Sequence, residues 1–434
     1  MPLPVAPKTP VIVLPGFYGS KLTERASGHL VWVDLAGLTS SATMDALRFD
    51  PGQPDRLQAT GILDAVPILP FWSYDVYRSF VSFLETNLNL QVFEFWFDWR
   101  RSLADLTDGL QRRIGRVLGD TGAAKVSLLA HSQGGLVARA CIDQFGLAEK
   151  IDWLVTFGTP HKGMLKTFKA LTSGLSVFTF GAASVKAASR TLPAAYEMLP
   201  NDADDGLFQW QGMPQSPFAV TDWCQTPEMR KLLADAAKVV VRTLPPTLPV
   251  KSALIYGTLL STTVQASGGP QGLSFRDLPQ GDATVPEVSA RGDGLTGDTL
   301  HRFAVPFCDH LLLFRQTQVQ QDVLTPILLG RPLPSAYLLA AFQSAPVFVP
   351  RQRNRIVAAL QDGIGNPIAN ADVRLTIDGT TIRNQPLAEQ PGRGDYSLDL
   401  TMPAQGGQLW WTVEARLPGS SQVLRQQGPL IGTS

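Results

Sequence analysis

The segment that constrains the architecture most is Lys125-Val-Ser-Leu-Leu-Ala-His-Ser-Gln-Gly-Gly135. An apolar run of strand length comes first, and Gly134–Phe145 after it has the composition of a helix. Ser132 lies at the junction, and the small residues Ala130 and Gly134 flank it two positions away on either side. A sharp turn from strand to helix strains the serine backbone, and bulky side chains at the flanking positions would clash. The segment therefore predicts a serine on a tight turn, where it can act as a nucleophile.

Segments of the same two kinds alternate on both sides of this turn. The strand candidates are Val11–Leu14, Val92–Phe97, Ile151–Phe157 and Ser252–Gly257, and the clearest amphipathic helix runs from Leu103 to Val117. Strands that alternate with helices at this spacing need crossover connections, which give a mainly parallel sheet with helices on both faces. Such a sheet carries its functional loops at the carboxyl ends of its strands. The serine turn and the alternation together predict an α/β-hydrolase fold.

Two regions depart from the alternation. Residues 164–235 contain a largely apolar, uncharged segment at 171–185 and are expected to form a cap or lid inserted over the sheet. In the C-terminal part, short segments alternate with period two: Val373–Ile377, Tyr396–Leu400 and Leu409–Leu417. This pattern predicts a small all-β sandwich of the immunoglobulin-like type. The expected domains are a catalytic domain over residues 1–344 and the sandwich over residues 345–434.

A nucleophilic serine needs a base, and α/β-hydrolases supply first the acid and then the base after the serine in the chain. The five histidines are His29, His131, His161, His301 and His310. His29 and His161 precede any acid that follows the serine, and the side chain of His131 leaves the turn in another direction. His310 lies in a loop before an apolar helix start, whereas His301 lies in a segment with the character of protein surface. His310 is therefore the predicted base, with a core or capping histidine as the alternative.

The expected acid is Asp282, in the segment Gly281-Asp-Ala-Thr-Val-Pro286. This segment follows the strand candidate Ser252–Gly257 and has the signature of a turn before a helix or strand. A turn or helix-capping aspartate is the alternative interpretation. Asp309 is the competing acid, but adjacent residues rarely face one another well enough for Asp309 to bond the ring of His310.

The negative oxygen of an acyl-transfer intermediate needs N–H donors. One is the backbone N–H of Gln133, directly after the serine at the start of the helix. The second is expected after an early strand, where Pro15-Gly-Phe-Tyr-Gly19 makes Phe17 the candidate and an ordinary turn the alternative. In this interpretation the serine attacks an acyl carbonyl, the histidine accepts its proton, and the aspartate orients the imidazole.

These pieces together resemble the lecithin:cholesterol acyltransferase family in its bacterial form. The similar segments are Leu14-Pro-Gly-Phe-Tyr-Gly-Ser-Lys-Leu22, Phe97-Asp-Trp-Arg100, Ala130-His-Ser-Gln-Gly-Gly135, Gly281-Asp-Ala-Thr-Val-Pro286 and His310, in the family's order. The resemblance implies a triad of Ser132, Asp282 and His310, and an oxyanion donor at Phe17. It also implies lipid acyl esters as substrates, with lipase, phospholipase or acyltransferase activity. Two features depart from the family: no cysteine pair is placed to form the lid disulfide of secreted members, and Gly158-Thr-Pro-His-Lys-Gly163 is more similar to bacterial lipases.

Charge, cysteines and hydropathy narrow the class of protein. Lys plus Arg equals Asp plus Glu at 37 each, so nothing favours a nucleic-acid partner or a general attraction to anionic membranes. Cys141, Cys224 and Cys308 form no metal-binding pair or disulfide framework, and reduced, buried thiols are expected. Residues 1–16 lack the pattern of a secretory signal, and no apolar run reaches the ~18 residues of a membrane span. These features favour a cytoplasmic protein without metal or other cofactor. The apolar segment of the cap could make transient contact with a membrane surface, and the alternative is that it packs on the catalytic domain.

Three functional interpretations stay open on the sequence. The favoured one is hydrolysis of lipid acyl esters through an acyl-enzyme. Transfer of the acyl group to an alcohol is the second, because water and alcohols compete for the same intermediate. The third is a binding protein on a hydrolase scaffold, with the C-terminal sandwich as its recognition module.

Asp98 and Arg100 could bind substrate, but a buried structural pair is favoured.

Overall fold

The computed structural model of the protein describes residues 8–33, 41–50, 55–69, 72–177, 180–203, 206–344, 347–391, 394–404 and 406–433. It divides into two compact units. The first consists of Met1–Leu254 and Ser261–Leu300, and the second of Ile255–Leu260 and His301–Ser434. Residues 1–7, where a signal sequence would begin, lie outside the described part.

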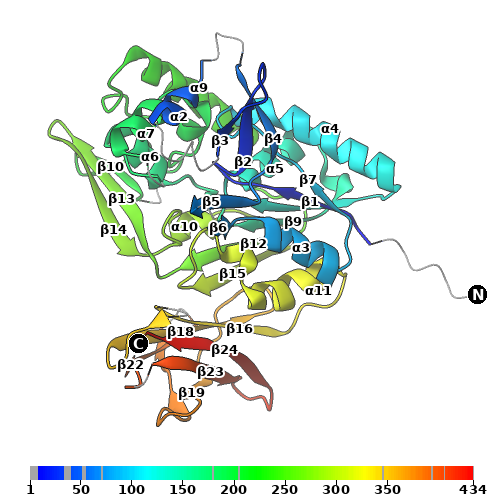
Figure 1. Ribbon diagram of the computed structural model, residues 1–434, viewed down its shortest axis with the longest axis vertical. Coiled ribbons are helices and arrows are strands. Elements are labelled where there is room, and N and C mark those ends of the chain that lie inside the picture. Colours follow the sequence, from blue (N-terminus) through cyan, green and yellow to red (C-terminus); the bar gives the residue numbers. More distant parts are fainter. Residues whose placement is uncertain are drawn as a thin grey trace, which may run out of the picture. The chain divides into compact units, whose positions relative to one another are not determined.

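A parallel sheet forms the centre of the first unit (Figure 1). Its strands follow the order β12-β9-β8-β1-β7, with bounds Ser252–Thr258, Ile151–Phe157, Val126–His131, Val11–Leu14 and Val92–Glu94. β1 pairs in parallel with β7 and β8, and β8 pairs in parallel with β9. Every residue of β1 and β8 is buried, as expected for central strands covered on both faces. Leu14 lies opposite Ala130, so the loop after β1 begins beside the residues that lead into Ser132.

Helices cover both faces of this sheet. α4 (Leu103–Thr121) and α5 (Gln133–Gln144) pack together on one side, and α3 (Arg78–Ser82) lies on the other (Figure 1). Phe80 of α3 packs edge-on against Phe157 of β9, with 5.7 Å between the ring centroids. The buried apolar face of α4 has the spacing expected from the sequence: Leu103, Leu106, Leu110, Ile114 and Val117. The sheet and its helices confirm the α/β-hydrolase fold.

Smaller elements complete the first unit. They are β2 (Ser20–Glu24), β3 (Leu30–Trp32), α2 (Ser41–Ala46), β4 (Leu57–Ile62), β5 (Ala65–Leu69), β6 (Trp72–Asp75), a π-helical turn (Phe83–Asn87), a 3-10 turn (Ala148–Lys150) and α10 (Glu287–Ala290). The expected insertion contains α6 (Leu165–Thr172), α7 (Ala182–Ser189), α8 (Pro193–Glu197), β10 (Phe208–Trp210), β11 (Met213–Pro214) and α9 (Pro227–Thr243). β10 pairs with β13 (Ser261–Gly269), which forms a hairpin with β14 (Gly272–Pro279). The sequence did not predict this hairpin, because β14 has only half-buried and exposed residues and no continuous apolar run.

The second unit begins with the end of β12 and with β15 (Leu300–Pro306), which is next to β12 in the strand order. Short helical turns follow at Leu313–Arg315, Val319–Leu324 and Thr325–Leu328, the last being α11. Two further sheets have the orders β16-β18-β22-β21 and β17-β24-β23-β19-β20. Their bounds are Ala336–Phe342 (β16), Val347–Phe348 (β17), Arg353–Asp362 (β18), Asp372–Ile377 (β19), Gln385–Pro386 (β20), Ala388–Gln390 (β21), Asp395–Thr401 (β22), Gly407–Arg416 (β23) and Val423–Gly432 (β24).

These two sheets share an apolar core. Alternate residues of β19, Val373, Leu375 and Ile377, are buried in it together with residues of β16, β18 and β22. The pairings are antiparallel except for that of β17 with β24, so the antiparallel sheets expected in the C-terminal region are confirmed. β16 pairs with β18, so one sheet includes residues on both sides of the expected domain boundary at 344/345, which stays a prediction.

The three cysteines are free and buried, as expected from the sequence. Burial raises the pKa of Cys141 to about 12 and that of Cys224 to about 11, so both are thiols at neutral pH. Among the helices of the described ranges, none has both the length and the apolar character that crossing a bilayer requires.

Candidate active site

Ser132 lies at the turn from β8 into α5, where the sequence placed it. Its backbone has φ 53° and ψ −122°, a combination that costs a residue with a Cβ roughly 1–3 kcal/mol. The N–H of Ser132 donates to the carbonyl oxygen of Phe157 over 2.9 Å, which fastens the turn to β9. Strain of this kind persists only where the surrounding fold holds it, and it is concentrated at functional sites. The turn therefore has the backbone geometry of a nucleophile elbow.

Close packing at two glycines brings the loop after β1 against this turn. A Cβ built on Gly16 would lie 2.8 Å from the Cβ of Ser132. A Cβ built on Gly134 would lie 2.5 Å from the carbonyl oxygen of Pro15. Real Cβ atoms essentially never approach other atoms closer than 3.0 Å, so neither position accepts a larger residue without a backbone shift. The loop that carries Phe17 and the serine turn are therefore in direct contact.

Phe17 and Gln133, the candidate oxyanion donors, lie on the two sides of this contact. Gln133 is the first residue of α5, where backbone N–H groups have no acceptor within the helix. Its side chain is fully buried, and Nε2 donates to the carbonyl oxygen of Trp99 over 3.1 Å. The ring of Phe17 packs edge-on against Trp99, with 4.9 Å between the ring centroids. Within the described part of the chain, the N–H of Phe17 makes no hydrogen bond, which leaves it for a ligand.

Asp282 lies in the loop between β14 and α10 and is fully buried. Its Oδ1 accepts hydrogen bonds from the N–H groups of Thr284 at 3.0 Å and Val285 at 2.7 Å. The N–H of Ala283 donates to Oγ1 of Thr262 over 2.9 Å, which ties the loop to β13. These bonds fix the orientation of the carboxylate, as a triad acid requires, and they also belong to the turn that the alternative interpretation expected.

His310 belongs to the second unit, in the turn after β15, and is 6% exposed. Oδ1 of the neighbouring Asp309 accepts the N–H of Leu311 at 3.0 Å. This bond gives Asp309 a role in the turn itself, in line with its lower rank as a triad acid. Ser132 and Asp282 belong to the first unit, so their pairing with His310 stays a prediction.

The prediction that His301 lies on the surface is wrong. His301 is in β15 and is only 8% exposed. Its ring stacks on that of Phe303, with 6.2 Å between the centroids and an angle of 9°. β15 alternates half-buried with buried residues, and the polar residues around His301 concealed this from the sequence. Burial lowers the pKa of His301, so its ring is neutral at neutral pH.

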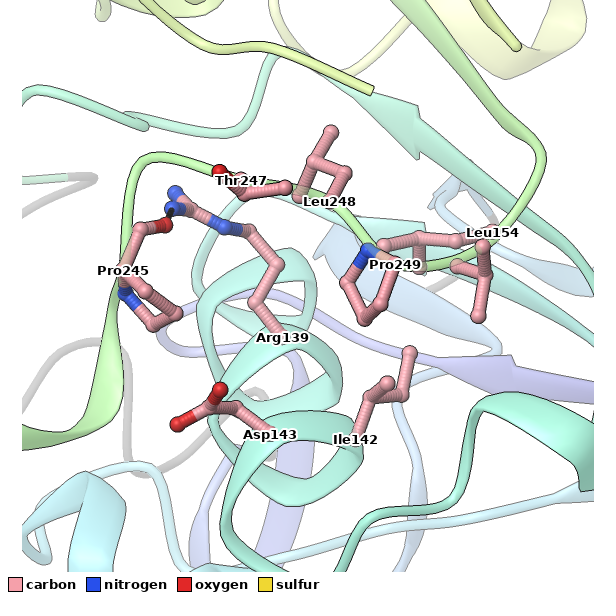
Figure 2. A pocket seen from close by; sticks show the side chains of 9 residues that line it. Arg139, Ile142, Asp143, Leu154, Pro245, Thr247, Leu248 and Pro249 are labelled. Atoms are coloured by element: carbon pink, nitrogen blue, oxygen red, sulfur yellow. Dashed lines mark hydrogen bonds between the residues drawn. The ribbon is translucent and has the colours of Figure 1, made fainter. Parts of the chain in front are cut away.

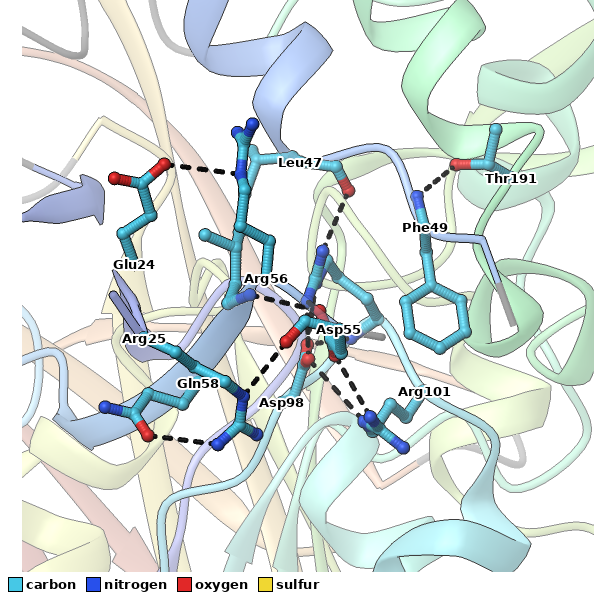
Figure 3. A network of polar contacts seen from close by, with 12 residues as sticks. Glu24, Arg25, Leu47, Phe49, Asp55, Arg56, Gln58, Asp98, Arg101 and Thr191 are labelled. Carbon is cyan, nitrogen blue, oxygen red and sulfur yellow. Dashed lines mark hydrogen bonds and ion pairs between the residues drawn. The ribbon is translucent and has the colours of Figure 1, made fainter. Parts of the chain in front are cut away.

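Asp98 and Arg100 form the buried ion pair that the sequence favoured (Figure 3). The guanidinium of Arg100 lies 2.7 Å from Asp98 and 2.9 Å from Asp55. Arg101 also reaches Asp55, at 3.0 Å, and the ring of Phe49 packs 5.4 Å from both guanidinium groups. Burial alone would lower the pKa of Arg100, but the hydrogen bonds and charges of Asp98 and Asp55 raise it. The network fixes the Asp-Trp-Arg segment that contacts the start of α5.

The segment Gly158–Gly163 contributes a second buried polar pair. Nδ1 of His161 lies 3.1 Å from a terminal guanidinium nitrogen of Arg139, and Nε2 lies 3.2 Å from Oγ1 of Thr156. Figure 2 shows Arg139 reaching from α5 toward Pro245, whose carbonyl oxygen accepts from it at 2.8 Å. Burial lowers the pKa of Arg139 to about 10. The adjoining cavity of about 10 Å³ holds no more than a water molecule, so this cluster is structural.

Comparison with known sequences gives a match to one family model over part of the chain. The sequence model of the family described as lecithin:cholesterol acyltransferase matches residues 48–242. The uncharacterized protein YJR098C of Saccharomyces cerevisiae is 27% identical over 156 residues, which are 35% of this chain and 23% of the yeast protein. The match thus spans about a quarter of the length of that relative.

Comparison with solved structures gives the same fold. A chain of the Tle4-Tli4 complex superposes with a TM-score of 0.55 at 14% identity, over 75% of this chain and 98% of that chain. The mature form of the Bacillus licheniformis lipase BlEst2 has a TM-score of 0.36 at 15% identity, over 76% of this chain and 95% of that chain. The family match supports an ester hydrolase or acyltransferase. Over residues 48–242, the chain is similar to the lecithin:cholesterol acyltransferase family.

Proposed function

We propose that the protein is a serine hydrolase that cleaves lipid acyl esters through an acyl-enzyme, with Ser132, Asp282 and His310 as its triad. The observation that carries the proposal is the strained turn at Ser132, packed between β9 and the loop after β1. A serine at the N-terminus of a buried helix is close to N–H groups and a dipole that stabilise negative charge. The family match over residues 48–242 supports lipid acyl esters as the substrate class.

In the proposed reaction, Oγ of Ser132 attacks the acyl carbonyl carbon while Nε2 of His310 takes the hydroxyl proton. Asp282 accepts a hydrogen bond from the Nδ1–H group of the imidazole and stabilises the imidazolium, without taking the proton. The carbonyl oxygen becomes an oxyanion, which the N–H groups of Phe17 and Gln133 stabilise. The imidazolium then gives its proton to the leaving alcohol as the ester C–O bond breaks. Water attacks the acyl-enzyme by the same route and releases the carboxylic acid.

Residues 164–235 are proposed as the cap of this site, with contact to lipid through their apolar part. Phe168 of α6 packs edge-on against Phe208 of β10 at 5.3 Å, so the region has a small aromatic core of its own. Nζ of Lys166, also in α6, donates to the carbonyl oxygen of Ala283 over 3.2 Å. Since Ala283 directly follows the proposed acid, this bond joins the cap region to the acid loop, which supports a cap over the reacting groups.

Hydrolysis and acyl transfer share every step up to the acyl-enzyme, so one experiment tests both. Purified protein is incubated with phosphatidylcholine vesicles, with and without a long-chain alcohol, and the products are identified by mass spectrometry. Hydrolysis gives free fatty acid in both mixtures, whereas transfer gives a new ester only where the alcohol is present. Ser132→Ala should form neither product. Ser420→Ala, at an exposed position between β23 and β24, should behave as the wild type.

Two results would contradict the proposal. One is full activity of Ser132→Ala, because the reaction would then proceed without the proposed nucleophile. The other is a folded wild type that turns over neither the vesicles nor a soluble short-chain ester. That second result, with the fold intact, would favour a binding protein on a hydrolase scaffold.

A further inference from the structure

A buried chain of hydrogen bonds joins the loop after β1 to the residue before the serine. The N–H of Gly16 donates to the hydroxyl oxygen of Tyr77 over 2.9 Å. The same hydroxyl lies 2.7 Å from Nδ1 of His131, the last residue of β8. Tyr77 is 1% exposed and His131 is 3% exposed, so solvent does not compete for these bonds. The chain therefore connects the loop after β1, the start of α3 and the end of β8.

The donors and acceptors in this chain determine where its protons lie. The hydroxyl of Tyr77 accepts the N–H of Gly16 and has one proton of its own to donate. Burial raises the pKa of Tyr77, which keeps the hydroxyl protonated at neutral pH. Nδ1 of His131 lies within bonding distance of the hydroxyl, and we infer that the hydroxyl donates to it, which places the ring proton of His131 on Nε2.

These hydrogen bonds determine which backbone N–H groups of the loop already have an acceptor within the protein. The N–H of Gly16 is used by Tyr77, and the carbonyl oxygen of Gly16 accepts the N–H of Gly19 at 2.9 Å. The N–H and the carbonyl oxygen of Gly16 are thus both hydrogen-bonded, which fixes the orientation of this residue. The next N–H in the loop, that of Phe17, makes no hydrogen bond within the described ranges and lies directly after this fixed residue.

We propose that Tyr77 and His131 are positioning residues that hold Gly16 and thereby aim the N–H of Phe17 at the oxyanion. Neither side chain touches the substrate in this proposal, because both act through the peptide backbone of Gly16. The inference rests on the proposed function, since an oxyanion forms only if the protein transfers acyl groups.

Loss of the Tyr77 hydroxyl would leave the buried N–H of Gly16 without its acceptor, and the loop would shift to recover one. A displacement of about 1 Å at a catalytic group lowers rates by about 100-fold, and loss of one oxyanion donor lowers kcat by about 100- to 1000-fold. We therefore expect Tyr77→Phe to lower kcat about 10- to 100-fold. KM should change less than about twofold, because the loop stabilises the transition state rather than the bound substrate.

The kinetic test compares Tyr77→Phe with a matched control, Tyr396→Phe, on a soluble short-chain ester. Tyr396 of β22 is also 1% exposed, and its hydroxyl accepts the N–H of Ala371 and donates to the carbonyl oxygen of Ile368, each over 2.9 Å. Both variants lose one buried hydroxyl, but only the first is linked to the loop. An unchanged kcat in folded Tyr77→Phe would overturn the inference. An equal loss of kcat in both variants would do the same, since it would reflect general destabilisation.

Two substitutions of His131 separate hydrogen bonding from packing. In His131→Asn the amide oxygen stands close to the place of Nδ1 and can accept the Tyr77 proton, whereas His131→Leu offers no acceptor. We expect His131→Asn to retain kcat within about threefold and His131→Leu to lose as much as Tyr77→Phe. The double variant of Tyr77→Phe and His131→Leu should be no slower than either single one, because both break the same chain. Equal kcat values for His131→Asn and His131→Leu would contradict the proposed chain of hydrogen bonds. Fully additive losses of kcat in the double variant would contradict it as well.

Nitrogen NMR of the imidazole ring tests the chain without any substrate. The wild type should show Nδ1 of His131 as an unprotonated hydrogen-bond acceptor and Nε2 as protonated, and Tyr77→Phe should change the Nδ1 resonance. A protonated Nδ1, or a spectrum that Tyr77→Phe leaves unchanged, would overturn the inference whatever the activity. If the NMR signature is present but the wild type turns over no ester, the proposed function is wrong. The hydrogen bonds from Gly16 through Tyr77 to His131 then exist but have no catalytic role. If the wild type is active and Tyr77→Phe has unchanged kcat, only the inference fails.

Discussion

The backbone of Gly16 packs directly against the side chain of Ser132, since a Cβ built on Gly16 would lie only 2.8 Å from the Cβ of Ser132. The two residues are far apart in the chain and meet because β1 and β8 are adjacent, parallel strands that end side by side. Parallel strands bring their carboxyl-end loops together at one edge of the sheet. One contact therefore joins the loop that carries Phe17 to the proposed nucleophile.

Gly16→Ala is expected to lower kcat by at least about 100-fold, because the added methyl group must push the loop or the serine out of place. The control is Gly115→Ala on the exposed face of α4, where an added Cβ meets nothing within 4 Å. That change should leave kcat unaltered and stabilise the protein by about 0.5–1 kcal/mol, because alanine is the better helix former. Steady-state kinetics and urea unfolding measure both effects. Wild-type activity in Gly16→Ala would show that the loop tolerates displacement.

Ser132→Gly is expected to be more stable than Ser132→Ala by about 1 kcal/mol. Both remove the hydroxyl, but only glycine adopts φ 53° and ψ −122° without strain. The relieved strain of roughly 1–3 kcal/mol outweighs the greater entropy that glycine gives the unfolded chain. Urea unfolding of the two variants measures the difference. Equal stability would mean that the turn stores no strain.

Arg100→Met is expected to destabilise the protein by about 3–5 kcal/mol, because Asp98 and Asp55 would be left buried without their cation. The matched control is Arg56→Met, which removes a 60% exposed arginine paired with Glu24 and should cost no more than about 1 kcal/mol. Chemical unfolding of both variants gives the comparison. A loss in Arg100→Met as small as in the control would refute a structural role for the network.

The buried carboxyl of Glu197 is expected to make stability depend on pH. It accepts the hydroxyl of Ser102 and the N–H of Leu103 at 2.7 Å, at the start of α4. Burial raises its pKa from 4.5 to about 7. Between these values the folded protein binds more protons than the unfolded chain, so stability falls as the pH rises through this window, by up to about 3 kcal/mol.

Urea unfolding at about pH 5 and about pH 8 measures this fall. Glu197→Gln should flatten the pH dependence, because the amide cannot ionise. Glu149→Gln, at an exposed position, should leave the dependence as it is in the wild type. If the unfolding free energy of the wild type rises over the same pH interval, the prediction of a raised pKa at Glu197 is wrong.

Much of the fold follows from local patterns in the sequence. β9 has the bounds Ile151–Phe157 that its apolar run predicted, and α4 buries the residues that recur at helical spacing. The turn at Ser132 was predictable because its requirements, a strand before it and small residues beside it, are adjacent in the chain. The hairpin of β13 and β14 was not, because most of its residues are half-buried or exposed and leave no clear apolar run.

Contacts between side chains that are far apart in the sequence could not be predicted from local sequence patterns. Tyr77 and His131 are 54 positions apart, and their hydrogen bond exists only because α3 packs beside the end of β8. Asp55 completes the network around Arg100 from 45 positions away, outside any motif. His301 was misplaced for the opposite reason, since its polar neighbours in the sequence suggested surface while β15 turns its ring inward. Sequence patterns report adjacent residues well and contacts between distant ones poorly.

The most direct test of the central claim is to identify the residue that a fluorophosphonate probe modifies, by mass spectrometry of the digested protein. We predict a single adduct, on Ser132, which forms at least about 100-fold more slowly in His310→Ala or Asp282→Ala because the serine loses its base or the base loses its orientation. A folded wild type that forms no adduct would contradict the account, as would an adduct that persists in Ser132→Ala.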